Sequence, residues 1–471
     1  MADKIYDVAI IGSGPGGYTA AIRAGQFGLK VALIEKDNKL GGTCLHVGCI
    51  PTKALLFNAE IWDHLKQAKE FGIDDVGTPK LNWAAIQDRK NKIVTKHAKG
   101  LEFLMRKNKV ETISGYGKLT GPANDGVLSV EVTNGSNKSI LQAKNVLLAT
   151  GSEARMLPGL EPGPQVLTNI EILSLPALPK SLVIVGSGAV GSEFASIYNS
   201  FGTDCTIVEM LPRIVPLEDE DVSKELDRSF RKRGIKTFVS ASVKKVEKTK
   251  DGVAVSFDVD GKAQVVTAEK VLIAVGRKPR TENIGLEKTK IKPDRGFIKV
   301  NEWLQTEEPG VYAVGDIIAG YPQLAHAGSM EGKVAVAHIA GKAAKKMTAM
   351  HVPAATYTHP EIGSVGLTEA KAKEKGLKVK IGKFPFSANS RASIVGAHEG
   401  FIKIVSDAQY GEILGVHIIG PQATELIAEA VVAIELEATV EDLMYTIHAH
   451  PTLAEGMLDA VESVEGLAIN F

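Results

Sequence analysis

A duplicated glycine-rich unit constrains the fold of this 471-residue chain more than any other feature. In its first copy, an apolar run over residues 5–11 leads into the string GSGPGG at 12–17. An Ala-rich segment over 18–27 follows, and then a second apolar run over 30–34 that ends on Glu35. This order predicts a buried parallel strand, a glycine turn, a helix, a second strand and an acid.

Each position of this unit has a chemical reason in a dinucleotide site. Gly12 makes the turn, Gly14 lets the backbone approach a pyrophosphate, and Gly17 lets helix and strand pack closely. The helix N-terminus offers free N–H groups and a positive dipole end to the phosphates. Glu35 can accept hydrogen bonds from a ribose hydroxyl, so we predict a dinucleotide site here.

The same unit occurs again over residues 181–209, with Gly186, Gly188 and Gly191 in the turn and Glu209 after the second strand. The offset from the first glycine to the acid is 23 residues in both copies, from 12 to 35 and from 186 to 209. This match in register predicts two dinucleotide sites. Glu209 would repel a 2′-phosphate, which favours NAD over NADP at the second site.

Two of the three cysteines, Cys44 and Cys49, follow the first unit directly. Five positions along a regular helix separate two Cα atoms by roughly 8 to 9 Å, whereas a disulfide prefers about 5.5 Å. The pair can bridge only where the backbone is distorted, and Gly48 and Pro51 supply such a place. We interpret the pair as a redox-active dithiol; two unrelated buried thiols are the alternative. Cys205 lies in an apolar run and is expected to be a plain buried thiol.

The residues after Glu35 lead straight into this pair, so the reactive end of the first nucleotide is expected to face the sulfurs. A flavin can exchange an electron pair with both a hydride carrier and a dithiol. Two nucleotide sites beside such a pair therefore indicate one tightly held redox cofactor and one exchanging nicotinamide.

Composition excludes several classes of function. With 55 acidic and 55 basic side chains the formal net charge is zero, so no global field attracts nucleic acid or anionic lipid. No run of 18 apolar residues occurs, which predicts that the chain does not span a membrane. The first apolar run begins near the N-terminus and leaves no room for a targeting peptide, and three cysteines suit a reducing compartment. We expect a cytoplasmic protein.

Further glycine-rich strand ends follow each unit. Thr150-Gly151 closes an apolar run after the first unit, and Gly276 closes a similar run after the second. Asp316 follows an apolar strand and can bond a ribityl or ribose hydroxyl or form a turn. Ala325 and His326 open a predicted helix whose amides can face a flavin carbonyl, and residues 62–106 are expected to form long amphipathic helices.

Near the C-terminus, His450 precedes Glu455 by five residues, with Pro451 in the intervening turn. Such a pair can form an imidazole base oriented by a carboxylate; a loop leading into a C-terminal helix is the alternative. Before it, the sequence predicts strands at 362–367, 401–406 and 413–418, and a helix from Pro421.

Together these motifs resemble the flavin-dependent pyridine nucleotide disulfide oxidoreductases over essentially the whole chain. The strings GGTC at 41–44, VGCIP at 47–51 and HAHPT at 448–452 are most similar to members that oxidise dihydrolipoyl groups. Two positions depart from the pattern: His46, where most relatives carry asparagine, and Thr52, which is commonly serine. Neither change removes a group that the reaction needs.

The resemblance implies a role for each motif. Cys44 would exchange with the substrate, and Cys49 would lie against the flavin. His450, held by Glu455, would be the base and would come from the partner subunit, and Lys53 and Glu193 would pair near the flavin. No metal is implied. The implied FAD site comprises Gly12, Gly14, Gly17, Glu35, Lys53, Thr150, Gly151, Asp316, Ala325 and His326, and the implied NAD site comprises Gly186, Gly188, Gly191, Glu209 and Gly276.

The implied fold is α/β, with two Rossmann-like dinucleotide-binding domains, a central FAD-associated segment and a C-terminal α+β dimerisation domain. The corresponding ranges are 1–151 for FAD and the redox-active disulfide, 152–280 for NAD, 281–349 for the central domain and 350–471 for the interface. A homodimer with one tightly bound FAD per subunit is implied.

The implied activity is oxidation of a protein-bound dihydrolipoyl group, with electrons passing through the cysteine pair and FAD to NAD+. The implied partners are lipoyl domains and the acyltransferase core of 2-oxoacid dehydrogenase complexes, or the lipoylated carrier of glycine cleavage. One alternative is a glutathione-type reductase, which would favour NADPH and basic residues in place of Glu209. Others are a mercuric reductase, which carries an extra C-terminal cysteine pair absent here, and a noncatalytic flavoprotein that binds a multienzyme complex.

Overall fold

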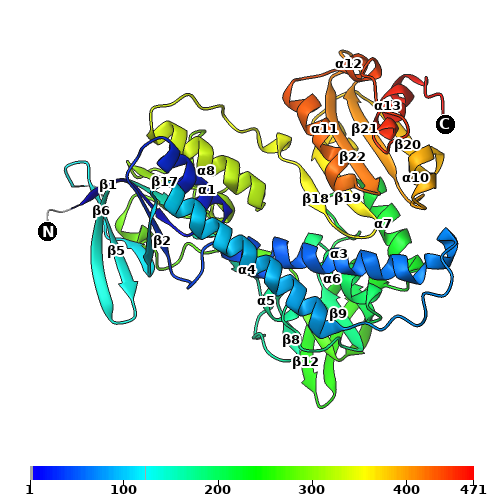
Figure 1. The fold of residues 1–471 in the computed structure, drawn as a ribbon, viewed down its shortest axis with the longest axis horizontal. Coiled ribbons are helices and arrows are strands. Elements are labelled where there is room, and N and C mark those ends of the chain that lie inside the picture. Colours follow the sequence, from blue (N-terminus) through cyan, green and yellow to red (C-terminus); the bar gives the residue numbers. More distant parts are fainter. Residues whose placement is uncertain (1–3, 122–123) are drawn as a thin grey trace. The chain divides into compact units, whose positions relative to one another are not determined.

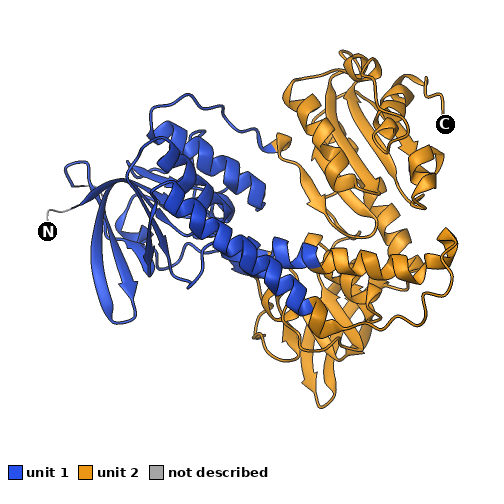
Figure 2. Cartoon of the chain, viewed as in Figure 1, with its two compact units in different colours: residues 1–54, 87–154, 277–349 blue, residues 55–86, 155–276, 350–471 orange. Residues whose placement is uncertain are grey.

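The computed structural model describes residues 4–121 and 124–471, and Figure 1 shows their fold. The chain forms two compact units, and each unit is assembled from three separate stretches of sequence (Figure 2). Unit 1 comprises residues 1–54, 87–154 and 277–349, and unit 2 comprises residues 55–86, 155–276 and 350–471.

A seven-stranded sheet forms the core of unit 1, in the order β3-β2-β1-β6-β5-β4, with β17 also paired to β6. The strands β3, β2, β1, β6 and β17 are parallel, whereas β4, β5 and β6 are joined in antiparallel fashion. Strand β2 is buried throughout, as expected for a parallel strand covered on both faces. The bounds are β1 Ile5–Ile11, β2 Val31–Glu35, β3 Glu111–Ser114, β4 Tyr116–Leu119, β5 Leu128–Asn134, β6 Asn137–Leu148 and β17 Val311–Ala313.

Unit 2 contains a second parallel sheet, in the order β11-β10-β9-β15-β8, with the antiparallel sheet β12-β13-β14. Its C-terminal part is an antiparallel sheet, in the order β18-β19-β22-β21-β20. The α/β class with two Rossmann-like parts is thus confirmed. The bounds are β8 Val166–Leu167, β9 Ser181–Val185, β10 Asp204–Val208, β11 Lys236–Phe238, β12 Ala241–Thr249, β13 Gly252–Val259, β14 Lys262–Ala268, β15 Lys270–Ile273, β18 Ala354–Thr356, β19 Glu361–Gly366, β20 Val379–Pro385, β21 Phe401–Asp407 and β22 Ile413–Gly420.

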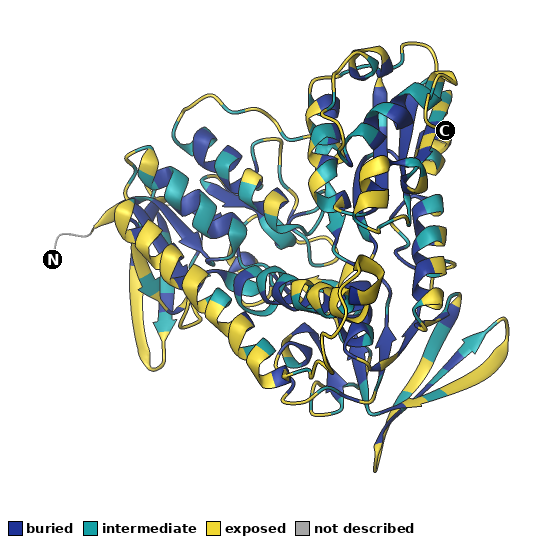
Figure 3. Cartoon of the chain, turned by 45° about the vertical axis from the view of Figure 1, so that its right-hand side comes forward, coloured by how far each residue is buried: buried dark blue, intermediate teal, exposed yellow. Residues whose placement is uncertain are grey.

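The helices cover these sheets, and Figure 3 shows buried residues concentrated in the strands and exposed residues along the outer helix faces. None of the helices described is long and apolar enough to cross a bilayer. The bounds of those in unit 1 are α1 Pro15–Gln26, α2 Gly42–Val47 and α8 Ala325–Ile339, with the short turn η3 Gly315–Ile317. Those in unit 2 are α5 Asn169–Ile172, α6 Ala189–Ser200, α7 Glu220–Lys232, α9 Glu369–Glu374, α10 Ser390–Ile394, α11 Ala423–Glu435, α12 Val440–Met444 and α13 Glu455–Glu462.

Two long helices, α3 (Cys49–Lys66) and α4 (Trp83–Lys107), begin in one unit and end in the other. The expectation of helices over 62–106 is therefore only partly right, because α3 starts much earlier and residues 72–82 contain no helix before α4 begins. Pro51 is compatible with the first turn of α3, where proline costs no hydrogen bond. After the short turn η1 (Ala68–Phe71), Gly72 has a φ of 70° and ends the helical path.

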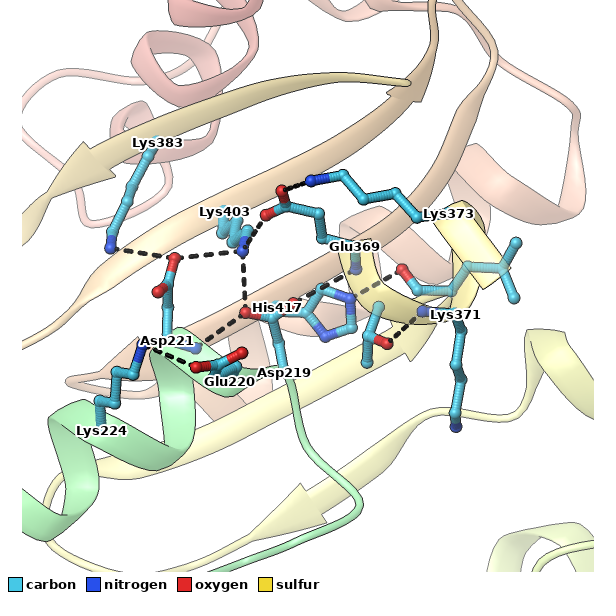
Figure 4. Close-up of polar contacts among 12 residues, drawn as sticks. Asp219, Glu220, Asp221, Lys224, Glu369, Lys371, Lys373, Lys383, Lys403 and His417 are labelled. Carbon is cyan, nitrogen blue, oxygen red and sulfur yellow. Dashed lines mark hydrogen bonds and ion pairs between the residues drawn. The ribbon is translucent and has the colours of Figure 1, made fainter. Parts of the chain in front are cut away.

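A buried ion cluster joins α7 to the C-terminal sheet of unit 2 (Figure 4). The ammonium of Lys403, on β21, lies 2.9 Å from Asp219, 3.1 Å from Asp221 and 2.8 Å from Glu369. The side chains of Lys403 and Asp219 are only 3% and 2% exposed. Asp219 also caps the N-terminus of α7 by accepting the N–H of Asp221. We call these four residues the Lys403 cluster.

Candidate functional site

The two fingerprint turns have nearly the same backbone geometry. Gly12 and Gly186 have φ angles of 104° and 97°, a region that favours glycine. A Cβ atom on Gly17 or Gly191 would collide with the carbonyl oxygen of the first glycine of its own turn. The repeat seen in the sequence is therefore a repeat of structure, with glycine required sterically at matching positions.

The open side of each turn is suited to an anion. A Cβ atom on Gly14 or Gly188 would meet nothing within 4 Å, so both backbones face open space. These residues are the N-caps of α1 and α6, and neither helix has a side-chain cap or an acidic residue in its first turn. Free N–H groups at an uncapped N-terminus are the usual ligands of a pyrophosphate, so both turns fit a dinucleotide.

The acid of each unit is buried beside its own turn. Glu35 accepts hydrogen bonds from the N–H and the hydroxyl of Ser13, at 2.9 and 2.6 Å. Glu209 accepts the same pair from Ser187, at 2.7 and 2.8 Å. The second oxygen of each carboxylate accepts the N–H two residues further on, at 2.9 and 2.8 Å. The prediction gave these serines no role, although serine at the same position of both copies was a visible signal.

The cysteine segment starts on the first fingerprint turn. The N–H of Gly41 donates hydrogen bonds to the carbonyl oxygen and the hydroxyl oxygen of Ser13, at 3.0 and 3.1 Å. A Cβ atom on Gly42 would lie 2.7 Å from the Cα of Gly14. Because α2 begins here and carries Cys44, the structure places the first cysteine beside the open turn.

The helical path breaks at Gly48, between the two cysteines, as predicted. Gly48 ends α2 with φ −144° and ψ −118°, and α3 begins at Cys49. A Cβ atom at residue 48 would lie 2.8 Å from the carbonyl oxygen of Thr43 and 3.2 Å from the Cα of Cys44. Glycine is therefore needed for close packing at this break. The side chains of Cys44 and Cys49 interact with each other through a hydrogen bond.

The groups around the two thiols shift the pKa of Cys44 in opposite directions. The hydrogen bond with Cys49, followed by burial, raises the pKa of the Cys44 thiol far above its ordinary value. The positive charge of Lys53, on α3, acts to lower it. Formation of a thiolate in this pair therefore depends on a base that removes the proton.

The two positions that depart from the family pattern have local partners. The hydroxyl of Thr52 donates to the carbonyl oxygen of Gly48 at 2.7 Å, a bond that serine could also make. The Nε2 atom of His46 lies 2.8 Å from the carbonyl oxygen of Leu40. Both side chains hold the backbone of the cysteine segment rather than the sulfurs.

The strand ends predicted to face the first nucleotide meet within unit 1. The hydroxyl of Ser152 bonds the carboxylate of Asp316, which lies on η3 directly after β17. Arg277 donates to the hydroxyl and the carbonyl oxygen of Ser152, at 2.6 and 2.9 Å, and lies 3.7 Å from Asp316. The hydroxyl of Thr150 donates to the carbonyl oxygen of Arg280 at 2.6 Å. Arg277 was missed, although its place after Gly276 pointed to it.

Helix α8 begins at Ala325, as predicted, with no side-chain cap on its first turn. His326 is exposed. The side-chain amide of Gln323 donates to the carbonyl oxygen of Asp316 at 3.0 Å and so joins the start of α8 to η3. The N-terminal amides of α8 and the carboxylate of Asp316 therefore belong to one local assembly.

The predicted histidine pair is formed within unit 2. His450 Nδ1 lies 2.8 Å from the carboxylate of Glu455, whose other oxygen accepts the N–H of Thr452 at 2.7 Å. Burial alone would raise the pKa of Glu455, but the bonds from Thr452 and His450 outweigh it and lower the pKa. The imidazole of His450 is 72% exposed and held at one nitrogen, which leaves Nε2 for a proton from outside.

The remaining predicted residues have clear positions. Gly276 has a φ of 103° and open space where a Cβ would be. Glu193 is 4% exposed and accepts the N–H of Tyr357 at 3.0 Å. Lys53 belongs to unit 1 and Glu193 to unit 2, and their pairing stays a prediction. Cys205 is fully buried, as expected.

Comparisons with known proteins agree with this geometry. Residues 6–332 match the family model described as pyridine nucleotide-disulphide oxidoreductase, and residues 352–461 match the dimerisation domain of that family. A dihydrolipoyl dehydrogenase of Bacillus subtilis is 46% identical and one of Rhizobium etli 45% identical, with at least 99% of both chains covered. The solved structure of LpdA from Mycobacterium tuberculosis is similar with a TM-score of 0.89, at 29% identity over 97% of this chain and 98% of that one.

Proposed function

Because the chain belongs to the pyridine nucleotide-disulphide oxidoreductase family, we propose that it is an NAD-dependent dihydrolipoyl dehydrogenase. The observation that carries the proposal is the cysteine pair of α2 and α3, which is tied to the first of two matching dinucleotide turns. Full-length relatives at 46% and 45% identity that have this name support it.

FAD binds at the first turn and NAD+ at the second. The turn of Gly12, Gly14 and Gly17 would present the α1 amides to the FAD pyrophosphate, and Asp316 would hold the ribityl chain. The FAD held at the first turn would supply two-electron redox chemistry between the reduced cysteine pair and NAD+. At the second turn, the carboxylate of Glu209 selects a free 2′-hydroxyl and thus NAD+ over NADP+.

The cysteine pair performs thiol–disulfide exchange. A thiolate of the dihydrolipoyl group attacks Sγ of Cys44 in the Cys44–Cys49 disulfide, and Cys49 leaves as a thiolate. The second sulfur of the substrate, as a thiolate, then attacks the substrate sulfur that is bonded to Cys44. The disulfide of oxidised lipoyl forms, the bond to Cys44 breaks, and Cys44 leaves as a thiolate. Two substrate thiols are oxidised and the two cysteines are reduced. Lys53 stabilises the negative charge that develops in the pair.

His450 is the base that accepts the proton of each substrate thiol in turn, and it releases the first proton to solvent before it accepts the second. Glu455 holds its Nδ1, which directs Nε2 toward the substrate. His450 lies in the part of the chain that matches the dimerisation domain, so we infer a homodimer in which each subunit supplies this base to its partner.

The physiological substrate is a lipoyl group on a carrier protein. The enzyme works in a 2-oxoacid dehydrogenase complex or in glycine cleavage, where it binds the acyltransferase core or the lipoylated carrier. A cytoplasmic location belongs to the same proposal, because a working dithiol pair suits a reducing compartment.

The test is NAD+ reduction by dihydrolipoamide in the Cys44→Ser enzyme. We expect loss of this activity with FAD still bound, because exchange has no sulfur to attack. Cys205→Ser is the matched control, since Cys205 is a buried thiol outside the site, and should keep the activity. Retention of dihydrolipoamide oxidation by Cys44→Ser would refute the mechanism.

A further inference from the structure

Glu331 is a buried carboxyl group that the proposed mechanism does not use. It lies on α8, is 1% exposed, and accepts the N–H of Gly315 through Oε2 at 2.6 Å. Its other oxygen, Oε1, is buried and has no hydrogen-bond partner within residues 4–121 and 124–471. A buried carboxylate oxygen without a partner is costly, so this group calls for an explanation.

Glu331 lies where the segments of the FAD site meet. Gly315 opens the η3 turn, which carries Asp316. Next to Glu331 on α8, a Cβ atom on Gly332 would lie 2.5 Å from the carbonyl oxygen of Gly16 in the first turn of α1. One side chain therefore joins α8 to the Asp316 turn, close to the α1 N-terminus that binds the pyrophosphate.

The surroundings of Glu331 disfavour its ionised form. Burial and, to a smaller extent, the carboxylate of Asp316 together raise the pKa of Glu331 to about 7, against the opposing effect of the Gly315 hydrogen bond. Tyr321, in the segment after η3, is a further titratable group near Glu331, and the charge of Glu331 contributes to raising its pKa. On the α1 side, Gly16 packs against this part of α8, and it carries no charged side chain. The two phosphates of FAD would add further negative charge at the α1 N-terminus.

We propose that Glu331 is a positioning residue for FAD, which fixes the Gly315–Asp316 turn against α8 and takes up one proton from solvent when FAD binds. The neutral group keeps Oε2 as the acceptor for Gly315. Protonation at Oε1 removes a buried negative charge that has no counter-ion or hydrogen-bond partner at this oxygen. The inference rests on the FAD site of the proposed function.

The experiment measures the affinity of the full-length protein for FAD at pH 6 and pH 8, from flavin fluorescence. A fixed subdenaturing concentration of guanidinium chloride brings the dissociation constant into a measurable range. With a pKa of about 7 without FAD, the wild-type protein should bind FAD about tenfold more weakly at pH 8 than at pH 6. Glu331→Gln mimics the neutral acid and keeps the Gly315 acceptor, so its affinity should change less than twofold.

Two further variants distinguish the effect of protonating Glu331 from the effect of its hydrogen bond with Gly315. Glu361→Gln is the control, because Glu361 is a carboxyl group in unit 2 whose pKa is also raised by burial. It should keep the tenfold dependence on pH. Glu331→Ala removes the acceptor and should weaken FAD binding at both pH values; if it fails to fold, the Gln variant still decides.

The outcomes are distinguishable. A wild-type affinity that is equal at both pH values, or a tenfold change that persists in Glu331→Gln, would overturn the role of Glu331 and leave the proposed function standing. A wild-type protein that binds no FAD at either pH would refute the proposed function, and this inference with it.

Discussion

Replacement of Lys403 by methionine should destabilise unit 2 far more than the loss of a surface ion pair. Lys403 Nζ lies within 3.1 Å of three carboxylates, and its side chain is 3% exposed. Burial alone would lower the pKa of Lys403, but hydrogen bonds with Glu369 and Asp219 outweigh it and raise the pKa. Methionine keeps much of the apolar stem but leaves Asp219 as a buried charge without its counter-ion.

Removing one partner of a buried ion pair costs about 3 to 5 kcal/mol. For a part of the chain with more than 250 residues, about 1 kcal/mol shifts the melting temperature by roughly 2 °C. We therefore expect the calorimetric transition of unit 2 to fall by roughly 6 to 10 °C in Lys403→Met. Scans of the FAD-loaded protein at one scan rate would measure this, because unfolding of a chain of this size is often irreversible.

Lys373→Met is the matched control. Lys373 also pairs with Glu369, at 2.6 Å, but its side chain is 62% exposed, so its loss should cost about 0 to 1 kcal/mol. Neutralising the orphaned carboxylate with Asp219→Asn should recover part of the stability lost in Lys403→Met. Equal shifts in the two lysine variants, or no recovery in the double variant, would refute the reasoning.

Three further predictions follow from the site and from the C-terminal sheet. Gly48→Ala should slow reduction of the enzyme by dihydrolipoamide at least tenfold without loss of FAD, because its Cβ would press on Cys44; stopped-flow flavin absorbance measures this, and an unchanged rate contradicts it. Subunits with Cys49→Ser and with His450→Ala should each be inactive, and mixed dimers should regain part of the activity; failure to do so would show that the base does not come from the partner. Burial lowers the pKa of His417, so the unfolded state binds the extra proton and stability should fall as pH drops below about 6.5. Melting temperatures from pH 8 to pH 5 should show a smaller loss in His417→Gln, and an equal loss would contradict this.

The sequence predicted the parts of the fold that local chemistry determines. Both fingerprint turns, their flanking strands and their acids lie where the spacing placed them, because a buried parallel strand and a tight glycine turn leave few alternatives. The first helix begins at Pro15 instead of residue 18, since proline is well suited to a first turn. The break at Gly48 was also predictable, because the cysteine spacing does not fit a regular helix.

Contacts between distant residues could not be predicted in this way. Lys403 lies in a strand whose pattern allows a solvent-facing lysine, and only the folded chain brings three carboxylates to it. Arg277 acquires its role from Ser152, which lies 125 residues away in sequence, and Glu331 acquires its role from a backbone contact with Gly315 that its own helix pattern does not indicate. Strand β20 and the short helices α9 and α10 were not predicted; the two helices have only six and five residues, too few for a helical periodicity to show.

The most direct test of the proposed function follows the electrons through the cysteine pair. The oxidised, FAD-loaded enzyme is mixed anaerobically with one equivalent of dihydrolipoamide, alkylated with iodoacetamide and analysed by mass spectrometry, with and without NAD+. We predict new alkylation at Cys44 and Cys49 but not at Cys205, and protection of both cysteines when excess NAD+ is added before the alkylating agent. Alkylation of the pair that does not depend on dihydrolipoamide, or that NAD+ does not reverse, would contradict the account.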